Sequence, residues 1–383
     1  MSKRVIILGS TGSIGSSAID VISRMGDPWE IVGLAAGSRA AELADQANRF
    51  RPRVVAISEA EAAPALTRLL EYAPTVLAGD DAMVRLLDEQ ACECVVCAVV
   101  GSSGLKATIR AVELGRRIAL ANKEALVMAG GLIMPLAART GATIIPVDSE
   151  HSAIFQILHG RRASEVHKVY LTASGGPFRT WSDETMNEIT VQDALQHPTW
   201  KMGPKITIDS ATMMNKAMEI VEAHWLFGLE ADRIEVVIHP ESIIHSMVEF
   251  CDGSMIAQLG TPDMRTPIQY ALTFPDRLAC PTPRLDLLKL RQLSFHPRDD
   301  RRFPALRLGY EVVRRGGTSG AVLNGANEAA VTLFREGVIH YRDITRYTEQ
   351  ALNQHNFNAA PALEDLLAAD RWAREEVARC TAC

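Results

Sequence analysis

The sequence lacks a hydrophobic run long enough to cross a membrane. Its longest uncharged apolar stretch, residues 125–138, has 14 residues and contains two glycines and a proline, whereas a transmembrane helix needs about 20 apolar residues. An excess of basic residues is also absent, because 40 Lys and Arg stand against 46 Asp and Glu and give a net charge of −6. We therefore expect neither a membrane nor a nucleic acid as a partner.

An even number of cysteines is lacking as well, because the chain has seven, so at least one has no partner for a disulfide within the chain. Only four residues precede the first apolar run, which predicts no signal or transit peptide. We therefore expect reduced thiols and a cytoplasmic location. Cys92, Cys94 and Cys97 have a spacing that raises the alternative of a zinc site. That site is disfavoured because strand alternation would place Cys94 and Cys97 on opposite faces and no fourth ligand is near.

The first 148 residues alternate short β-branched runs with amphipathic stretches, which predicts an α/β fold with a mostly parallel sheet covered on both faces. The expected strands are residues 5–8, 30–36, 54–57, 75–78, 94–99, 118–120 and 143–146. The expected helices among them are residues 13–23, 39–49, 81–90 and 106–114.

The pattern changes after residue 148. An α+β region follows, with expected strands at 166–173, 234–239 and 255–259. Proline, arginine and aspartate then dominate residues 275–304, which predicts an extended linker because proline interrupts helices and central strands. The remaining segments, 306–315, 319–335, 344–355 and 362–377, have helical spacing. The predicted division is therefore a Rossmann-like domain at 1–148, a catalytic α+β domain at 149–273, a linker at 274–303 and a helical bundle at 304–383.

Glycines at every third position, Gly9, Gly12 and Gly15, follow the first strand and open the first helix. They allow a tight turn and a close approach of backbone N–H groups to a diphosphate. The second expected strand ends in Gly37-Ser38-Arg39, without the acidic residue that NAD sites place there. A hydroxyl and a guanidinium suit a 2′-phosphate, which favours NADP(H). A tight turn without a ligand, and a solvated Arg39, are the alternatives.

Two acids, Asp148 and Glu150, directly follow the last expected strand of the sheet. Ligands bind at this edge of open parallel sheets, and we expect both acids on an extended turn, pointing the same way. Spacing alone favours an ordinary surface or helix-capping residue for each acid, and only their joint appearance with other polar groups favours a site.

A third acid, Glu219, lies on a helix that we expect to begin near residue 211 or 212. On that helix Asn215, Lys216 and Glu219 share one face. Two like charges about 4 Å apart repel by roughly 4 kcal/mol at an effective dielectric of 20. Three converging carboxylates therefore require either a cation or strongly raised pKa values, and all-oxygen ligands favour Mg²⁺ or Mn²⁺ as the cation.

Nine segments of the chain together resemble the 1-deoxy-D-xylulose 5-phosphate reductoisomerase family. They are LGSTGSIG (8–15), LANKEALV (120–127), PVDSEHSAIFQ (146–156), SGGPFR (174–179), HPTWKMGPKI (197–206), DSATMMNKAMEI (209–220), IHPESIIHSM (238–247), GTPDMRTPI (260–268) and LNGANE (323–328). The resemblance implies an NADPH domain, a central catalytic domain, a linker and a C-terminal helical bundle, in a homodimer.

The resemblance also implies a role for individual residues. The metal ligands would be Asp148, Glu150 and Glu219, which with Lys123 form the catalytic set. The substrate would be held by Lys123, Ser149, Glu150, Ser174, His197, Ser210, Asn215, Lys216 and Glu219. A flap over residues 197–202 would include His197, Trp200 and Met202. NADPH would be contacted by Thr11, Gly12, Ser13, Ile14, Gly37, Ser38, Arg39, Asn122, Glu124 and Gly203. Ser38 and Arg39 depart from some family members.

The implied reaction converts 1-deoxy-D-xylulose 5-phosphate to 2-C-methyl-D-erythritol 4-phosphate, on the route to isoprenoid precursors. A divalent metal would hold the carbonyl and an adjacent hydroxyl, the carbon skeleton would rearrange by retro-aldol cleavage and re-aldolisation, and NADPH would reduce the resulting aldehyde. Lys123 would stabilise developing oxyanion charge. The alternatives are a plain NADP-dependent dehydrogenase of a metal-chelating hydroxy acid and a non-catalytic NADP(H)-binding regulator.

Three further side chains carry open interpretations. His151 either orients the neighbouring acids or has only a packing role. His239 is either a group near the site or a hydrogen-bonded structural histidine. Glu222, one turn after Glu219, is interpreted as a salt-bridge partner and not as a metal ligand.

Overall fold

The computed structural model describes residues 3–26, 28–200 and 202–381. The chain forms two compact units, each built from three segments. Unit 1 comprises Met1–Asn122, Ile133–Ser152 and Asp263–Thr282, and unit 2 comprises Lys123–Leu132, Ala153–Pro262 and Pro283–Cys383. None of the helices in the described residues is both long enough and apolar enough to span a bilayer.

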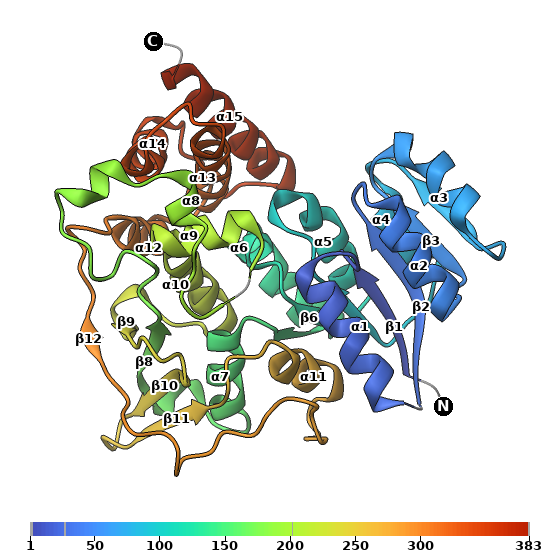
Figure 1. The fold of residues 1–383 in the computed structure, drawn as a ribbon, viewed down its shortest axis with the longest axis horizontal. Coiled ribbons are helices and arrows are strands. Elements are labelled where there is room, and N and C mark those ends of the chain that lie inside the picture. The colour runs from blue at the N-terminus through green and yellow to red at the C-terminus, as the bar shows by residue number, and fades with distance from the viewer. Residues whose placement is uncertain (1–2, 27, 201, 382–383) are drawn as a thin grey trace. The chain divides into compact units, whose positions relative to one another are not determined.

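Unit 1 contains a seven-stranded parallel sheet in the order β4-β3-β2-β1-β5-β6-β7 (Figure 1). The strands are β1 (Lys3–Leu8), β2 (Trp29–Ala36), β3 (Val54–Ile57), β4 (Thr75–Ala78), β5 (Cys94–Cys97), β6 (Arg117–Leu120) and β7 (Thr143–Pro146). Most of their residues are buried, as the continuous apolar runs of a parallel sheet covered on both faces require. The predicted α/β class is confirmed, and all seven strands lie within two residues of the expected bounds.

The helices of unit 1 pack against these strands. They are α1 (Ser13–Met25), α2 (Ala40–Phe50), α3 (Ala63–Leu69), α4 (Ala82–Glu89), α5 (Leu105–Glu113) and α11 (Arg265–Thr273), with 3₁₀ turns η1 (Ala60–Ala62) and η2 (Gly101–Gly104). Helix α11 comes from the third segment of the unit and packs on α1, β6 and β7. Two helices, α6 (Lys123–Thr140) and α7 (Ser149–Leu158), begin in one unit and end in the other.

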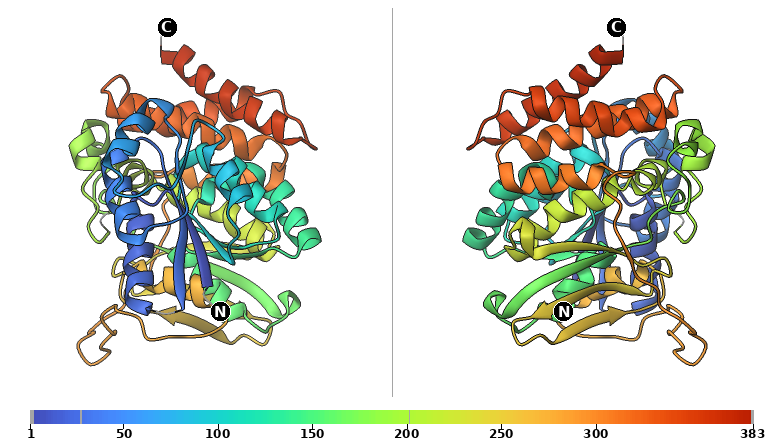
Figure 2. Two further views of the ribbon diagram at one scale, coloured as in Figure 1. Left: turned by 90° about the vertical axis from the view of Figure 1, so that its right-hand side faces the viewer. Right: turned by 90° about the vertical axis from the view of Figure 1, so that its left-hand side faces the viewer.

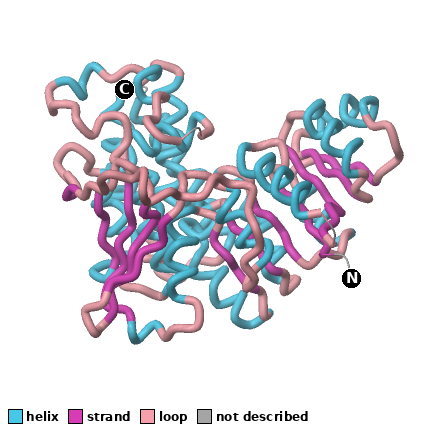
Figure 3. Tube along the Cα trace, turned by 60° about the horizontal axis from the view of Figure 1, so that its bottom comes forward, coloured by secondary structure: helices cyan, strands magenta, loops and turns pink. Residues whose placement is uncertain are grey.

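Unit 2 contains a five-stranded sheet in the order β11-β10-β8-β9-β12, drawn in magenta in Figure 3. Its strands are β8 (Val166–Ala173), β9 (Ile234–Ile238), β10 (Ile244–Phe250), β11 (Met255–Leu259) and β12 (His296–Pro297). Only β8 and β9 run parallel. Strand β10 was not expected, because His245 and Ser246 interrupt its apolar pattern; both are buried in β10, which pairs with β8 and β11.

The helices of unit 2 are α8 (Val191–Ala194), α9 (Pro204–Ala211), α10 (Met214–Phe227), α12 (Ala305–Arg315), α13 (Ser319–Arg335), α14 (Tyr341–Gln354) and α15 (Leu363–Thr381), with 3₁₀ turns η3 (Ala163–Glu165), η4 (Thr185–Glu188) and η5 (Ala231–Arg233). Figure 2 shows the C-terminal helices, orange to red, at one end of the unit and the strands at the other. One apolar cluster joins β8, β9 and α10 to α12, α13 and α14. The four-part domain division stays a prediction.

Candidate active site

The glycine-rich turn of unit 1 lies where the strand order of the sheet reverses. Strand β1 pairs with β2 on one side and β5 on the other, and such a switch point is where nucleotides bind in open α/β sheets. A Cβ on Gly9, whose φ is +82°, would lie 2.5 Å from the carbonyl oxygen of Ala98. A Cβ on Gly15 would lie 2.2 Å from the carbonyl oxygen of Gly9. Only glycine fits both positions.

The turn ends in the N-terminus of α1, which begins at Ser13. Its N-cap residue, Gly12, makes no side-chain capping bond, and no acid lies in the first turn of the helix. A helix start of this kind favours an anion because its amide groups and its dipole point outward. The predicted nucleotide residues Thr11, Ser13 and Ile14 all lie in this turn or in the first turn of α1.

The predicted 2′-phosphate residues follow β2. Gly37, Ser38 and Arg39 are exposed, and Arg39 is the N-cap residue of α2. Asn122, also predicted to contact NADPH, is buried and its Nδ2 donates to the carbonyl of Gly101 at 3.0 Å. These residues therefore belong to unit 1.

Two predicted nucleotide contacts lie in unit 2. Gly203 is the exposed N-cap residue of α9. Glu124 is buried and its carboxylate pairs with Lys205 at 3.2 Å. Burial tends to raise the pKa of Glu124, but the neighbouring charges of Lys205 and Lys123 outweigh it and lower that pKa below its ordinary value. Glu124 is therefore a charged carboxylate held inside unit 2.

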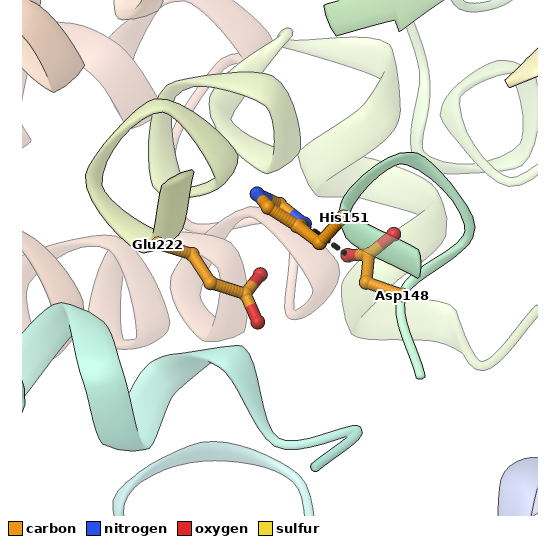
Figure 4. Close-up of side chains that lie close together, drawn as sticks. All are labelled: Asp148, His151 and Glu222. Carbon is orange, nitrogen blue, oxygen red and sulfur yellow. Dashed lines mark ion pairs between the residues drawn. The ribbon is translucent and has the colours of Figure 1, made fainter. Parts of the chain in front are cut away.

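The two acids after β7 are placed differently from the expectation. Helix α7 begins at Ser149, so Glu150 lies in its first turn, and the predicted extended turn is wrong. A helix N-terminus favours acids in this position, which explains the helical start. One carboxylate oxygen of Asp148 and one of Glu150 lie within 4.8 Å of each other. Nδ1 of the fully buried His151 lies 4.0 Å from Oδ2 of Asp148 (Figure 4).

This pair of carboxylates suits a divalent cation. At an effective dielectric of about 20, two charges at the separation of Asp148 and Glu150 repel by roughly 3 kcal/mol. A bound cation removes that cost, and carboxylate oxygens are the ligands that Mg²⁺ and Mn²⁺ prefer. His151 next to Asp148 agrees with the interpretation that it orients the acids.

The other half of the predicted site is a buried charge cluster in unit 2. Glu219 is 1% exposed, and its carboxylate accepts hydrogen bonds from three side chains. Lys123 donates from Nζ at 3.2 Å, Asn215 donates from Nδ2 at 2.6 Å, and Lys216 donates from Nζ. Lys123 also donates to Oδ1 of Asn215 at 2.9 Å. Two buried lysines therefore donate to one carboxylate, and donor groups gathered in this way suit an anionic ligand.

The turn that carries Ser210 and Asn215 was predicted incorrectly in one respect. A helix was expected to begin near residue 211 or 212, but α9 ends at Ala211 and α10 begins at Met214. Met213 between them is left-handed, with φ of +62°. This break places Ser210 at the end of one helix and Asn215 at the start of the next, so both lie at a single sharp turn.

The Ser174 hydroxyl is oriented by its neighbours. Nδ1 of His197 accepts from the N–H groups of Thr199 and Trp200, at 3.1 and 2.9 Å, so a neutral imidazole carries its proton on Nε2. Nε2 then donates to Oγ of Ser174 at 3.0 Å, and the N–H of Gly176 donates to the same oxygen at 3.2 Å. A hydroxyl has two acceptor positions, so the Ser174 proton points away from these two donors.

His197 holds the turn at the start of the predicted flap. Burial lowers the pKa of His197 below its ordinary value, which favours the neutral ring that the two N–H donors require. The ring centroid of Trp200 lies 6.4 Å from that of His245, and Met202 is half-buried. Lys201 of the predicted flap lies outside the described residues.

One buried ion network was not anticipated. Lys205 on α9 pairs with Asp209 at 2.8 Å as well as with Glu124, and Nδ2 of Asn327 on α13 donates to Asp209 at 2.8 Å. Burial tends to lower the pKa of Lys205, but Asp209, Glu124 and Glu328 together raise it. The spacing of four between Lys205 and Asp209 was visible in the sequence. Their partners lie 81 and 118 residues away.

The remaining candidates have structural roles. Nδ1 of His239 lies 2.9 Å from the carbonyl of Ser294, while its Nε2 accepts from the N–H groups of Ile243 and Ile244. These bonds favour the interpretation of a structural histidine. Burial raises the pKa of the Cys94 and Cys97 thiols to about 12, which disfavours the thiolate that a zinc ligand needs.

Comparison with known proteins connects these features. Residues 5–130 match the family description "1-deoxy-D-xylulose 5-phosphate reductoisomerase", and residues 144–227 and 259–376 match two C-terminal domains of the same enzyme. A protein of that name from Synechococcus sp. is 49% identical over 98% of this chain and 97% of its own length. This chain belongs to the 1-deoxy-D-xylulose 5-phosphate reductoisomerase family.

Solved structures of the reductoisomerase family have the same fold. The enzyme from Zymomonas mobilis in complex with NADPH superposes with a TM-score of 0.93 at 42% identity, covering 100% of this chain and 99% of that one. A second reductoisomerase, in complex with NADPH, fosmidomycin and magnesium, superposes with a TM-score of 0.91 at 38% identity over 99% of this chain and 98% of that one. The resemblance stated from the sequence is confirmed.

Proposed function

We propose that this chain is an NADPH- and divalent-metal-dependent reductoisomerase that converts 1-deoxy-D-xylulose 5-phosphate to 2-C-methyl-D-erythritol 4-phosphate. Reductoisomerases of its family have been solved with NADPH and with magnesium. The observation that carries the proposal is Glu219, buried between two lysines and an amide at the turn that also carries Ser210. A plain dehydrogenase has no use for such a donor-rich anion site, and a regulator has no use for the buried carboxylate.

The substrate phosphate binds, in this proposal, to the donors of unit 2. Ser174 offers its hydroxyl proton, Ser210 and Asn215 lie at the α9–α10 turn, and Lys216 supplies charge. Lys216 is 4% exposed, and a buried cation attracts an anion more strongly than a solvated one does. Because the phosphate lies far from the reacting carbons, its binding energy serves to hold the reacting end in place.

The metal ligands in this proposal are Asp148, Glu150 and Glu219, with Mg²⁺ or Mn²⁺ as the ion. Their all-carboxylate chemistry and the close approach of Asp148 and Glu150 support this assignment. When bound, the ion supplies Lewis acidity to the carbonyl and the adjacent hydroxyl of the substrate. Ser149 lies between the two unit 1 ligands, donates to Glu150 and contacts the sugar.

Lys123 acts on the charge that develops during the rearrangement. The residue is 5% exposed, and its ammonium group is already hydrogen-bonded to Asn215 and Glu219. A cation held in this way needs no reorganisation when an oxyanion forms beside it. His197, Trp200 and Met202 form a flap that excludes water from the reactive fragments.

NADPH binds to the glycine turn of unit 1 and reduces the aldehyde by hydride transfer. The diphosphate faces Thr11, Gly12, Ser13 and Ile14. The 2′-phosphate meets Gly37, Ser38 and Arg39, where the exposed guanidinium follows a strand end without an acid. Asn122, Glu124 and Gly203 complete the set; Glu124 acts from its buried position through Lys205.

We also propose a homodimer in the cytoplasm, with domains divided at residues 148, 273 and 303.

The proposed dimer is supported by strand β11. This strand is an edge of the unit 2 sheet, and its residues Met255 and Leu259 are 51% and 37% exposed. An exposed apolar edge strand favours pairing with another chain, and a two-fold dimer buries it on both copies. Light scattering across a concentration series measures the mass.

One assay tests the proposed activity. The protein is incubated with 1-deoxy-D-xylulose 5-phosphate and NADPH, with Mg²⁺ or with a chelator, and the nicotinamide absorbance is followed. We expect substrate-dependent loss of NADPH with Mg²⁺ and none with the chelator. Absence of any substrate-dependent loss refutes the proposal. NADPH binding without metal-dependent turnover would identify the regulator instead.

A further inference from the structure

Helices from the C-terminal part of unit 2 contact the turn that carries Ser210. The hydroxyl of Tyr341, the first residue of α14, donates to the carbonyl of Ala211 at 2.6 Å. Nδ2 of Asn327 on α13 donates to Oδ1 of Asp209 at 2.8 Å. The residues immediately before and after Ser210 are therefore both fixed by side chains that are more than a hundred positions away in the sequence.

Tyr341 also reaches the loop that carries Ser174. Its ring packs edge-to-face on Phe178, with centroids 5.3 Å apart, and Phe178 is 1% exposed. In the same loop, a Cβ on Gly176 would lie 2.7 Å from the carbonyl oxygen of Ser210. One tyrosine thus contacts both segments that supply the serines, and those segments touch each other through their backbones.

The turn itself depends on contacts of this kind. Met213 is left-handed at φ of +62°, a conformation that non-glycine residues keep only where their surroundings hold it. The carbonyl of Ala211 belongs to the last turn of α9, where carbonyls lose their partners within the helix. The Tyr341 hydroxyl satisfies that carbonyl, so it stabilises the break between α9 and α10.

Burying the polar side chain of Asn327 costs free energy, which a position that serves packing alone does not require. It is fully buried, and so is Asp209, whose second oxygen pairs with Lys205. Buried polar pairs of this kind are often replaced by apolar residues without loss of stability. Keeping one next to Ser210 fixes the direction of a carboxylate and, with it, the register of the α9 end.

We propose that Asn327 and Tyr341 are positioning residues for the substrate phosphate. They act through Asp209 and Ala211 on Ser210, and through Phe178 on the Ser174 loop, and so set the spacing of the two hydroxyls. This inference rests on the proposed phosphate site. It gives the C-terminal helices a part in substrate recognition beyond completing the core.

The test compares two variants with two matched controls. Tyr341→Phe removes one hydroxyl and keeps the ring, and Asn327→Ala removes the amide. The control Asn324→Ala removes a buried amide one turn earlier on α13, which donates to Asp370 at 2.8 Å. The control Tyr310→Phe removes a buried hydroxyl that accepts from Arg298 at 2.7 Å. The hydrogen bonds of the two controls join them to Asp370 and Arg298, which lie outside α9.

We expect Tyr341→Phe and Asn327→Ala to lower kcat/KM for the phosphorylated substrate about tenfold, mainly through KM, as the loss of one fixing hydrogen bond predicts. We expect the KM for NADPH to stay within about twofold of the wild-type value. In both controls, kcat/KM for the substrate and KM for NADPH stay at wild-type values, even where the melting temperature of a control falls as far as that of the variants. A Tyr341→Phe enzyme with unchanged substrate KM refutes the inference, as do controls that match the variants.

The same measurements separate this inference from the proposed function. If the wild-type protein consumes no NADPH with the substrate, the proposed function is wrong. If it does and the Tyr341→Phe variant behaves like wild type, only the positioning role is wrong. Tyr341→Phe is the smaller change and decides the question if Asn327→Ala does not fold.

Discussion

The two units build their candidate sites from different materials. In unit 1 the nucleotide turn is made of backbone, with glycines at 9, 12 and 15 and the start of α1. In unit 2 the proposed substrate cluster is made of the buried charged side chains Glu219, Lys123 and Lys216. If the proposed assignments hold, the cofactor site relies on chain geometry, whereas the site for the small phosphorylated substrate relies on individually placed charges.

The largest effect is expected in unit 2. Glu219→Gln removes the carboxylate charge to which Lys123 and Lys216 donate. We expect kcat to fall by about 10³-fold, because a preorganised charge is lost where the chemistry needs it, while the affinity for NADPH is kept. Turnover and NADPH binding measured on the same sample check this.

The control for that variant is Glu376→Gln on α15. Glu376 is also a buried glutamate of unit 2, 7% exposed, and pairs with Arg379 at 2.8 Å. It is expected to leave turnover unchanged. If Glu219→Gln keeps more than a tenth of wild-type turnover, the contrast between charge-built and backbone-built sites breaks down.

An intermediate effect is expected in unit 1 from adding a single methyl group. Gly15→Ala would place a Cβ 2.2 Å from the carbonyl oxygen of Gly9, so the turn must shift. A displacement of about 1 Å at a positioned site costs roughly a hundredfold, and we expect that loss in NADPH affinity. Fluorescence titration with NADPH measures it.

Gly33→Ala is the matched substitution in β2. Its Cβ would meet Cδ1 of Leu86 at 2.9 Å, which is the end of a flexible side chain and not backbone. We expect NADPH affinity within about twofold of wild type. Equal losses in the two variants would mean that sheet packing, and not the turn, determines nucleotide binding.

The smallest effect is a pH dependence in unit 2. Burial lowers the pKa of His197, so its neutral form, and the turn it holds, is fully present above the ordinary pKa of about 6.5 and is lost as pH falls through the lowered pKa. We therefore expect the substrate KM to rise by no more than about fourfold between pH 8 and pH 6. Initial rates at several substrate concentrations give the profile.

His197→Asn sharpens this prediction, because the Asn Oδ1 can accept the two N–H groups without titrating. We expect the substrate KM of this variant to be higher than that of wild type, but not to rise further as the pH falls from 8 to 6. Burial also lowers the pKa of His355, on the C-terminal side of α14. His355→Asn is therefore the control, and we expect its substrate KM to rise at low pH as in wild type. If the substrate KM of His197→Asn still rises as the pH falls, the pH dependence belongs to another group.

Local patterns predicted much of the architecture. The seven strands of unit 1 follow from β-branched runs alternating with amphipathic ones, because a parallel sheet buried on both faces needs continuous apolar strands. Strand β10 escaped prediction because its polar residues are buried only through pairing with β8 and β11. Periodicity within one segment carries no information about such neighbours.

The candidate site divides in the same way. The motifs around Asp148, Ser174 and Glu219 could be recognised in the sequence, because their residue types and order are sufficient to identify the family. The helical start at Ser149 and the break at Met213 were predicted incorrectly. Both depend on interactions that a short stretch of sequence does not reveal. The helix dipole stabilises the acids at the start of α7, and the hydroxyl of Tyr341, from a distant helix, stabilises the break at Met213.

By itself, then, the sequence determined the alternation of strands and helices, the glycine turn and the family, because each follows from spacing along the chain. Only the tertiary structure decided which polar groups are buried together. Asp209 meets Asn327 across 118 positions and Ala211 meets Tyr341 across 130. Burial makes those contacts strong, since water no longer competes for the hydrogen bonds, and burial is a property of the packed chain.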